Sequence, residues 1–111
     1  MQLNRTVTGI NQLTLSDKKT TTTEWFTFDF TNMLASGESL SSITSVVNTK
    51  ISGGSDATPS AMLSGSASIS GKTVLQLVTG GLNGRTYKMV VTVSTSASNT
   101  LVLTAYLPVV T

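Results

Sequence analysis

The sequence contains no cysteine and no histidine. Without cysteine the chain forms no disulfide, and it offers no thiolate to a zinc site, an iron–sulfur cluster or a catalytic mechanism. Without histidine it lacks the side chain that serves most often as a general base and as a metal ligand. These two absences argue against an enzyme, and we expect no cofactor, no metal and no small-molecule substrate.

Charge is also scarce, because only 11% of the 111 residues are charged, against about a quarter in an average soluble domain. Seven Lys and Arg and five Asp and Glu give a net charge of +2. The cations are scattered, and only Lys18 and Lys19 are adjacent. Nucleic-acid surfaces combine clustered cations with interleaved aromatic residues. We therefore predict no direct binding of nucleic acid.

Long apolar runs are missing as well. No stretch approaches the roughly 18 apolar residues of a membrane helix, and the first residues lack the apolar run of a signal peptide. The expectation is a protein synthesised in the cytoplasm, with no membrane partner. The length fits one domain.

In place of charge the sequence has hydroxyl groups, with 16 Ser and 20 Thr. Apolar residues recur with a period of two, which is typical of β-strands. No segment of helical length has a 3.6-residue period. Strand patterns cover residues 25–30, 40–51, 61–63, 67–69, 72–79, 86–94 and 100–109.

These strands predict an all-β fold, an immunoglobulin-like antiparallel β-sandwich of about seven strands. We divide the chain into an N-terminal extended arm or extra strand with its linker (1–23) and the sandwich (24–111). The linker includes the polar residues 16–23. A further expectation is that Pro108 interferes with pairing in the last strand.

The candidate core is built on three phenylalanines that alternate along one strand. Ile43, Val47 and Ile51 are possible core contacts on the long strand that follows. The full set assigned to the core of the sandwich is Phe26, Phe28, Phe30, Val74, Tyr87, Met89 and Leu103.

The segment Gly80-Gly81-Leu82-Asn83-Gly84 is expected to reverse the chain tightly, since Asn-Gly is a strong turn signal. Tyr87 follows at the start of the penultimate strand. Sandwich domains place a tyrosine there whose hydroxyl stabilises a corner. The alternative interpretation, an ordinary half-buried strand tyrosine, stays open.

The candidates for catalysis are weak. Paired-carboxylate hydrolysis needs two acids about 5–10 Å apart across a cleft. Asp29 and Glu38 are the pair that could approach each other, but solvated strand and turn carboxylates explain them better. A serine nucleophile would have only Lys50 or Lys72 as its base, and either adjacency to Ser is expected by chance in so Ser-rich a chain.

Uncharged, β-branched strands leave sheet edges poorly protected against pairing with another chain. This property favours a component of an assembly, unless bulges and turns protect the edges. The residues that we assign to such contacts are Leu3, Val7, Ile10 and Leu13 in the arm, which would add a strand to an adjacent subunit, and Trp25.

Several motifs resemble a family of small tailed-phage virion proteins. Residues 25–30 (WFTFDF) and 34–40 (LASGESL) resemble the opening of that family, an aromatic-x-x-Asp-aromatic segment followed by Leu-Ala-x-Gly-acid. Residues 74–87 match its Val-x5-Gly-Gly-x-x-Gly-x-x-Tyr signature, and 91–98 resemble the Val/Thr strand that follows. The resemblance covers roughly residues 24–109.

The family is the phage fibre–tail adaptor family, and it implies an immunoglobulin-like sandwich without catalytic residues. The implied function is a structural virion protein, an adaptor present in several copies at the neck or tail. Its partners would be tail, neck or fibre proteins and copies of itself.

A second hypothesis is a capsid decoration protein or a host-surface module that binds glycans. In that case the loops 52–60 and 80–84 would contact sugars and Trp25 would stack on a sugar ring. The location of the protein on the particle separates the two hypotheses.

Overall fold

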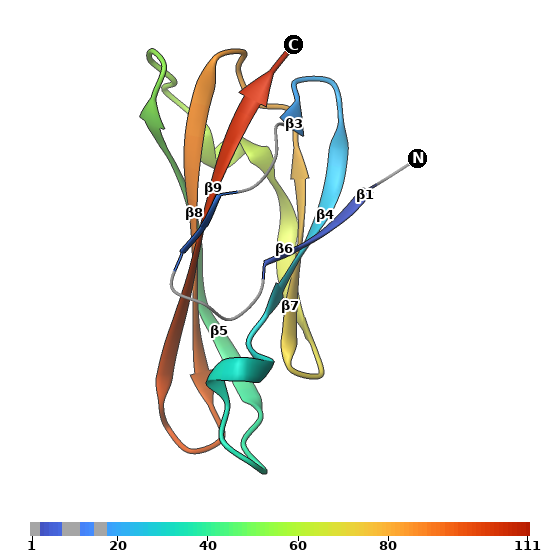
Figure 1. Cartoon of the computed structure of the whole chain (residues 1–111), viewed down its shortest axis with the longest axis vertical. Helices are drawn as coiled ribbons and strands as arrows, with labels where there is room; N and C mark the ends of the chain where they lie inside the picture. The colour runs from blue at the N-terminus through green and yellow to red at the C-terminus, as the bar shows by residue number, and fades with distance from the viewer. Residues whose placement is uncertain (1–2, 8–11, 15–17) are drawn as a thin grey trace.

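The computed structural model describes the backbone of residues 3–7 and 12–14 and all of residues 18–111. Two β-sheets face each other across the molecule (Figure 1). One sheet has the strand order β1 (Leu3–Val7), β4 (Thr23–Asp29), β7 (Thr73–Thr79) and β6 (Leu63–Ser70). The other has the order β2 (Gln12–Thr14), β9 (Thr100–Val110), β8 (Arg85–Thr95) and β5 (Leu40–Ser52), and β3 (Lys18–Lys19) also pairs with β9. The predicted all-β sandwich is confirmed.

The strand order is that of an immunoglobulin domain. Within one sheet, β1, β4, β7 and β6 lie in the order of strands A, B, E and D of that fold. Within the other sheet, β9, β8 and β5 lie in the order of strands G, F and C. Pairing among β4 to β9 is antiparallel, whereas β1, β2 and β3 run parallel to their partners. The N-terminal segment therefore contributes strands to both sheets.

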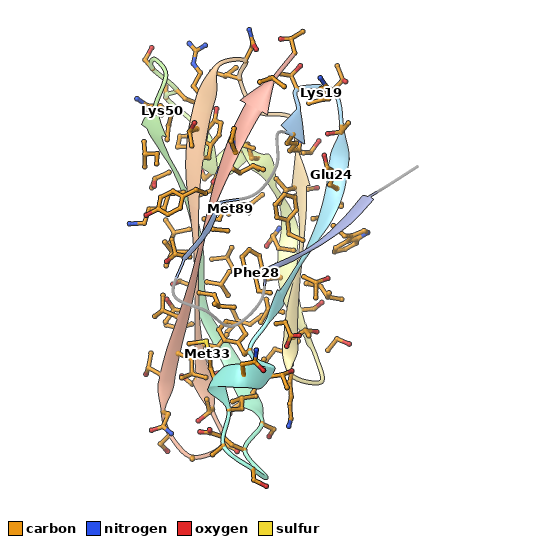
Figure 2. All side chains as sticks on the ribbon, in the orientation of Figure 1. Lys19, Glu24, Phe28, Met33, Lys50 and Met89 are labelled. Carbon is orange, nitrogen blue, oxygen red and sulfur yellow. The ribbon has the colours of Figure 1, made fainter. Side chains whose placement is uncertain are left out.

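The core lies between the sheets, where inward-facing residues alternate with outward-facing ones along each strand. Figure 2 shows Phe28 of β4 and Met89 of β8 between the two layers. The seven residues on which the core was expected to be built have no exposed surface: Phe26, Phe28, Phe30, Val74, Tyr87, Met89 and Leu103.

The long strand β5 shows where period-two reasoning fails. Val47 and Ile51 were expected in the core, but they are 46% and 48% exposed, and only Ile43 packs against the core. The pairing of β5 with β8 has register shifts between Ile43 and Ser45 and again after Lys50. A bulge inserts one extra residue and reverses the faces beyond it, so Asn48 is buried and the assignment of Val47 and Ile51 is wrong.

The region between β5 and β7 also differs from expectation. The two weak strand patterns at 61–63 and 67–69 form the single strand β6, preceded by the 3-10 turn η2 (Pro59–Met62). A second 3-10 turn, η1 (Thr31–Met33), follows β4.

Pro108 does not end β9, because Thr86 of β8 pairs opposite it. It lies between the residues of β9 that pair with β2 and those that pair with β3. Its missing amide hydrogen therefore breaks no pairing with either short strand.

Candidate functional site

One end of the sandwich is organised around the hydroxyl group of Tyr87. This hydroxyl accepts a hydrogen bond from the backbone N–H of Leu82 (3.1 Å) and donates one to Oδ2 of Asp56 (2.6 Å). Burial, and then the bond to Asp56, raise the pKa of Tyr87. The same bond, with the Thr58 amide, lowers the pKa of Asp56. Tyr87 therefore has the geometry of a tyrosine corner, in which the hydroxyl returns to the backbone just upstream.

The turn before Tyr87 depends on glycine. Gly80, Gly81 and Gly84 all have positive φ angles, 67°, 103° and 78°, which other residues adopt at a cost. A Cβ atom on Gly81 would lie 3.0 Å from side-chain atoms of Met62 and Val109. The motif quoted from the sequence is thus explained by turn geometry and close packing at this end of the sandwich.

Lys18 is a feature of this end that the sequence did not reveal. Its side chain has no exposed surface, and its Nζ donates hydrogen bonds to the carbonyl oxygens of Lys19 (2.9 Å), Thr22 (2.7 Å) and Gly80 (2.7 Å). Lys18 therefore joins β3 to the start of β4 and to the glycine turn. The polar composition of residues 16–23 predicted a linker here, and nothing in a Lys-Lys pair distinguishes a buried lysine from a solvated one.

We name this region, which contains Lys18, Asp56, Gly80, Gly84 and Tyr87, the tyrosine end. The opposite end, the glutamate end, is organised around Glu38, which precedes β5. The carboxylate of Glu38 accepts hydrogen bonds from Thr95 Oγ1 (2.5 Å), Asn99 Nδ2 (2.9 Å) and the Ala35 amide (2.9 Å). These bonds lower its pKa. Glu38 thereby ties the connection after β4 to the turn between β8 and β9.

The two carboxylates considered for hydrolysis have separate structural tasks. Asp29 Oδ1 accepts bonds from the amide and the hydroxyl of Thr31, and the hydroxyl bond is the larger cause of its lowered pKa. The carboxylate of Glu38 accepts hydrogen bonds from Thr95, Asn99 and Ala35. Among the residues that the structure describes, no cluster of three potential metal ligands occurs. Within the same residues, no helix is long and apolar enough to span a membrane.

The residues assigned to contacts from the sequence lie on different elements. Trp25 is on the outward face of β4 and is 37% exposed. Leu3 and Val7 begin and end β1, which pairs with β4, while Leu13 lies in β2 opposite Ala105 of β9. Ile10 lies outside the described residues. Contact of these residues with another subunit stays a prediction.

The fold and the two polar clusters together define a structural β-sandwich of the immunoglobulin type, whose buried polar groups hold loops in place. One protein family matches residues 18–108, and it is described as podophage GP4 fiber-tail adaptor protein gp77. The chain belongs to this family of phage fibre–tail adaptors. Neither the curated proteins nor the solved structures gave a match.

The match agrees with the resemblance noted in the sequence and begins further upstream. It starts at Lys18 rather than at residue 24, and Lys18 is the residue whose Nζ joins β3 to the glycine turn. The family region therefore includes β3 as well as all strands from β4 to β8 and most of β9.

Proposed function

We propose that the protein is a non-enzymatic structural component of a podophage virion that joins the fibre to the tail, with several copies in each particle. The observation that carries this proposal is the family match, which extends over nearly the whole sandwich. The protein would act as a spacer: the sandwich keeps its shape while its surfaces contact the two neighbours. Its partners would be fibre, tail or neck proteins and further copies of itself, with no direct contact to the packaged genome.

The surfaces available for these contacts agree with this role. Trp25 presents an aromatic side chain on the outward face of β4, beside Leu77 of β7, its partner in the sheet. The N-terminal strand β1 borders β4 on its other side. We infer that Leu3 and Val7 of β1 form one contact with a neighbouring virion protein together with Trp25, and that Ile10 and Leu13, further along the N-terminal arm, form a second.

A cryo-microscopy map of the intact virion tests the proposal. Density for the sandwich at the junction of fibre and tail is the expected result. Density over the capsid faces, or at fibre tips, would instead support the decoration or glycan-binding alternative and exclude the adaptor role.

Incorporation of variants into particles tests the contact. We expect that Trp25→Ser, or deletion of residues 1–16, reduces the amount of the protein in purified particles. Val102→Ser is the matched control, since Val102 is also exposed (43%) but lies on β9 in the other sheet. Each variant is first checked for folding by circular dichroism, and full incorporation of both test variants would exclude this contact.

A further inference from the structure

The strand β5 ends its sheet, with β8 on one side and no strand of the described residues on the other. It is 13 residues long, and from Ser45 to Lys50 it pairs with β8 without interruption. A regular strand at a sheet edge presents a row of backbone N–H and C=O groups that a further strand can pair with. β5 therefore offers six consecutive residues of regular edge.

The other sheet edges in the described part of the chain are less suited to pairing. The register of β6 with β7 is broken between Ser64 and Ser68, where Gly65 has a φ of 72°. β1 and β2 are only five and three residues long. Short strands, bulges and covering segments are the usual means of protecting an edge. The central part of β5 is neither short nor bulged, and although η2 packs beside it through Asn48 and Pro59, no backbone hydrogen bond joins η2 to β5.

The side chains of β5 also favour contact with another chain. Val47 and Ile51 are the two most exposed large hydrophobic residues in the described part of the chain. No charged residue occurs from Leu40 to Thr49. Charged side chains on an edge normally oppose pairing, and their absence here leaves a neutral, β-branched surface.

We propose that β5 pairs with β5 of a second copy of this chain, antiparallel and across a two-fold axis at Val47. Such an axis places Val47 opposite Val47 of the second copy and Ser45 opposite Thr49. Each of these pairs lies on one face of the joint sheet, as antiparallel pairing requires. The arrangement combines a pair of β-branched residues with two hydroxyl pairs, both of which stabilise adjacent strands.

The charges fit this register. Lys50, the first charged residue on β5, would lie opposite Thr44 of the second copy rather than opposite another lysine, so that no like charges meet. The same surface patch serves both partners, which defines an isologous dimer. This register joins the two five-residue segments Ser45–Thr49, between the bulges that follow Ile43 and Lys50.

So short a ladder buries much less than the roughly 800 Å² per partner of a stable interface. The dimer is therefore weak in free solution and becomes populated where other contacts concentrate the copies, as in a particle. The inference rests on the multiple copies in the proposed function and specifies the surface through which two of them associate.

Because the chain has no cysteine, a single cysteine introduced at Val47 can form a disulfide only with the same residue of a second copy, and this tests the proposed axis. Residues directly opposite in an antiparallel pair have Cα atoms about 4.5–5.5 Å apart, within the range of a disulfide. We expect mild oxidation to convert Val47→Cys into a covalent dimer at protein concentrations where Val102→Cys remains monomeric. Equal cross-linking of both variants would show random collision and overturn the proposal.

Charge exchange at Val47 provides a second measurement that does not depend on oxidation. In sedimentation velocity, the wild type should form dimers as concentration rises, and Val47→Lys and Val47→Glu alone should associate at least tenfold more weakly. An equimolar mixture of the two variants should restore association, because opposite charges then meet at the axis. A wild type that stays monomeric to millimolar concentration, or that forms oligomers beyond a dimer, would overturn the proposal.

These results are independent of the adaptor role. If the wild type is monomeric but density for it lies at the junction of fibre and tail, β5 pairing is wrong and the proposed function stands. If the dimer forms but the density lies elsewhere on the particle, the proposed function is wrong and the pairing stands.

Discussion

The tyrosine end and the glutamate end of the sandwich hold their loops by different chemistry. At the tyrosine end, the cation of Lys18 and the hydroxyl of Tyr87 act largely through backbone groups: the carbonyls of Lys19, Thr22 and Gly80, and the amide of Leu82. At the glutamate end, the carboxylate of Glu38 accepts hydrogen bonds from three donors. The first arrangement depends on buried donors and close backbone packing, whereas the second depends on one acceptor remaining ionised.

The two ends also differ in the space around a glycine in each. At the tyrosine end, Gly53 lies so close to the backbone of Gly84 that an added Cβ would overlap with it, whereas nothing lies within 4 Å of a Cβ added to Gly37 at the glutamate end. Close packing at the tyrosine end is a property of particular glycines such as Gly53 and Gly81, because a Cβ added to Gly80 or Gly84 would also meet nothing within 4 Å. We expect the tyrosine end to tolerate substitution less well.

The largest effect is expected at Lys18. Replacing it with Met removes three hydrogen bonds that a fully buried side chain donates to backbone carbonyls, so Lys18→Met should lower the free energy of unfolding by about 3–5 kcal/mol. Urea denaturation measures this change. Lys19→Met is the control, because the side chain of Lys19 is exposed, and an equal loss in both variants would contradict the anchoring role.

A paired alanine substitution compares the backbone packing of the two ends. Gly53→Ala should cost about 2–4 kcal/mol, since a positive φ and a clash with the backbone of Gly84 combine. Gly37→Ala should cost only about 1 kcal/mol, the penalty for its φ of 82° alone. Thermal denaturation of both variants provides the measurement. Similar losses would mean that the two ends are equally tightly packed.

Removing one oxygen tests the corner itself. Tyr87→Phe keeps the ring in the core but leaves the Leu82 amide and Asp56 without their partner. We expect a loss of about 1–3 kcal/mol in the free energy of unfolding, with faster amide exchange in the loop that contains Asp56. Tyr106→Phe, on the outward face of β9, serves as control and should change neither quantity.

The smallest effect is expected at the glutamate end and depends on pH. The pKa of Glu38 is lower in the folded chain than its ordinary value, so the folded state binds a proton less readily than the unfolded state. The resulting stabilisation is complete above about pH 4.3, the ordinary value for a glutamate. It is lost as the pH falls through the lower folded value.

Glu38→Gln should therefore flatten the dependence of unfolding free energy on pH in the acid range. Asp29 and Asp56, whose pKa values are also lowered, retain the remaining slope. Lys72→Met, a change of an exposed cation, should leave the slope close to that of the wild type. An unchanged slope in Glu38→Gln would show that its bonds do not persist in solution.

Sequence reasoning performed best where one physical rule acts locally. Alternation placed the three phenylalanines of β4 on one face, and the position of Tyr87 before a Val-rich strand suggested a corner hydroxyl. The sequence did not predict the roles of side chains whose hydrogen-bond partners are far away along the chain. Glu38 meets Thr95 and Asn99, 57 and 61 residues away, and Lys18 meets Gly80, 62 residues away. The bulges in β5 left no local signal, which is why Val47 and Ile51 were placed on the wrong face.

The parallel pairing of β2 and β3 with β9 has a mechanical consequence. Parallel neighbours start at the same end of a ladder. A tension that draws the N-terminal side of β2 and the C-terminal side of β9 apart therefore acts along the strands and loads their hydrogen bonds together. An antiparallel hairpin pulled at its two ends opens one bond at a time instead. Lys18 also joins β3 to the glycine turn, so this ladder is tied to the end of the sandwich that holds Tyr87.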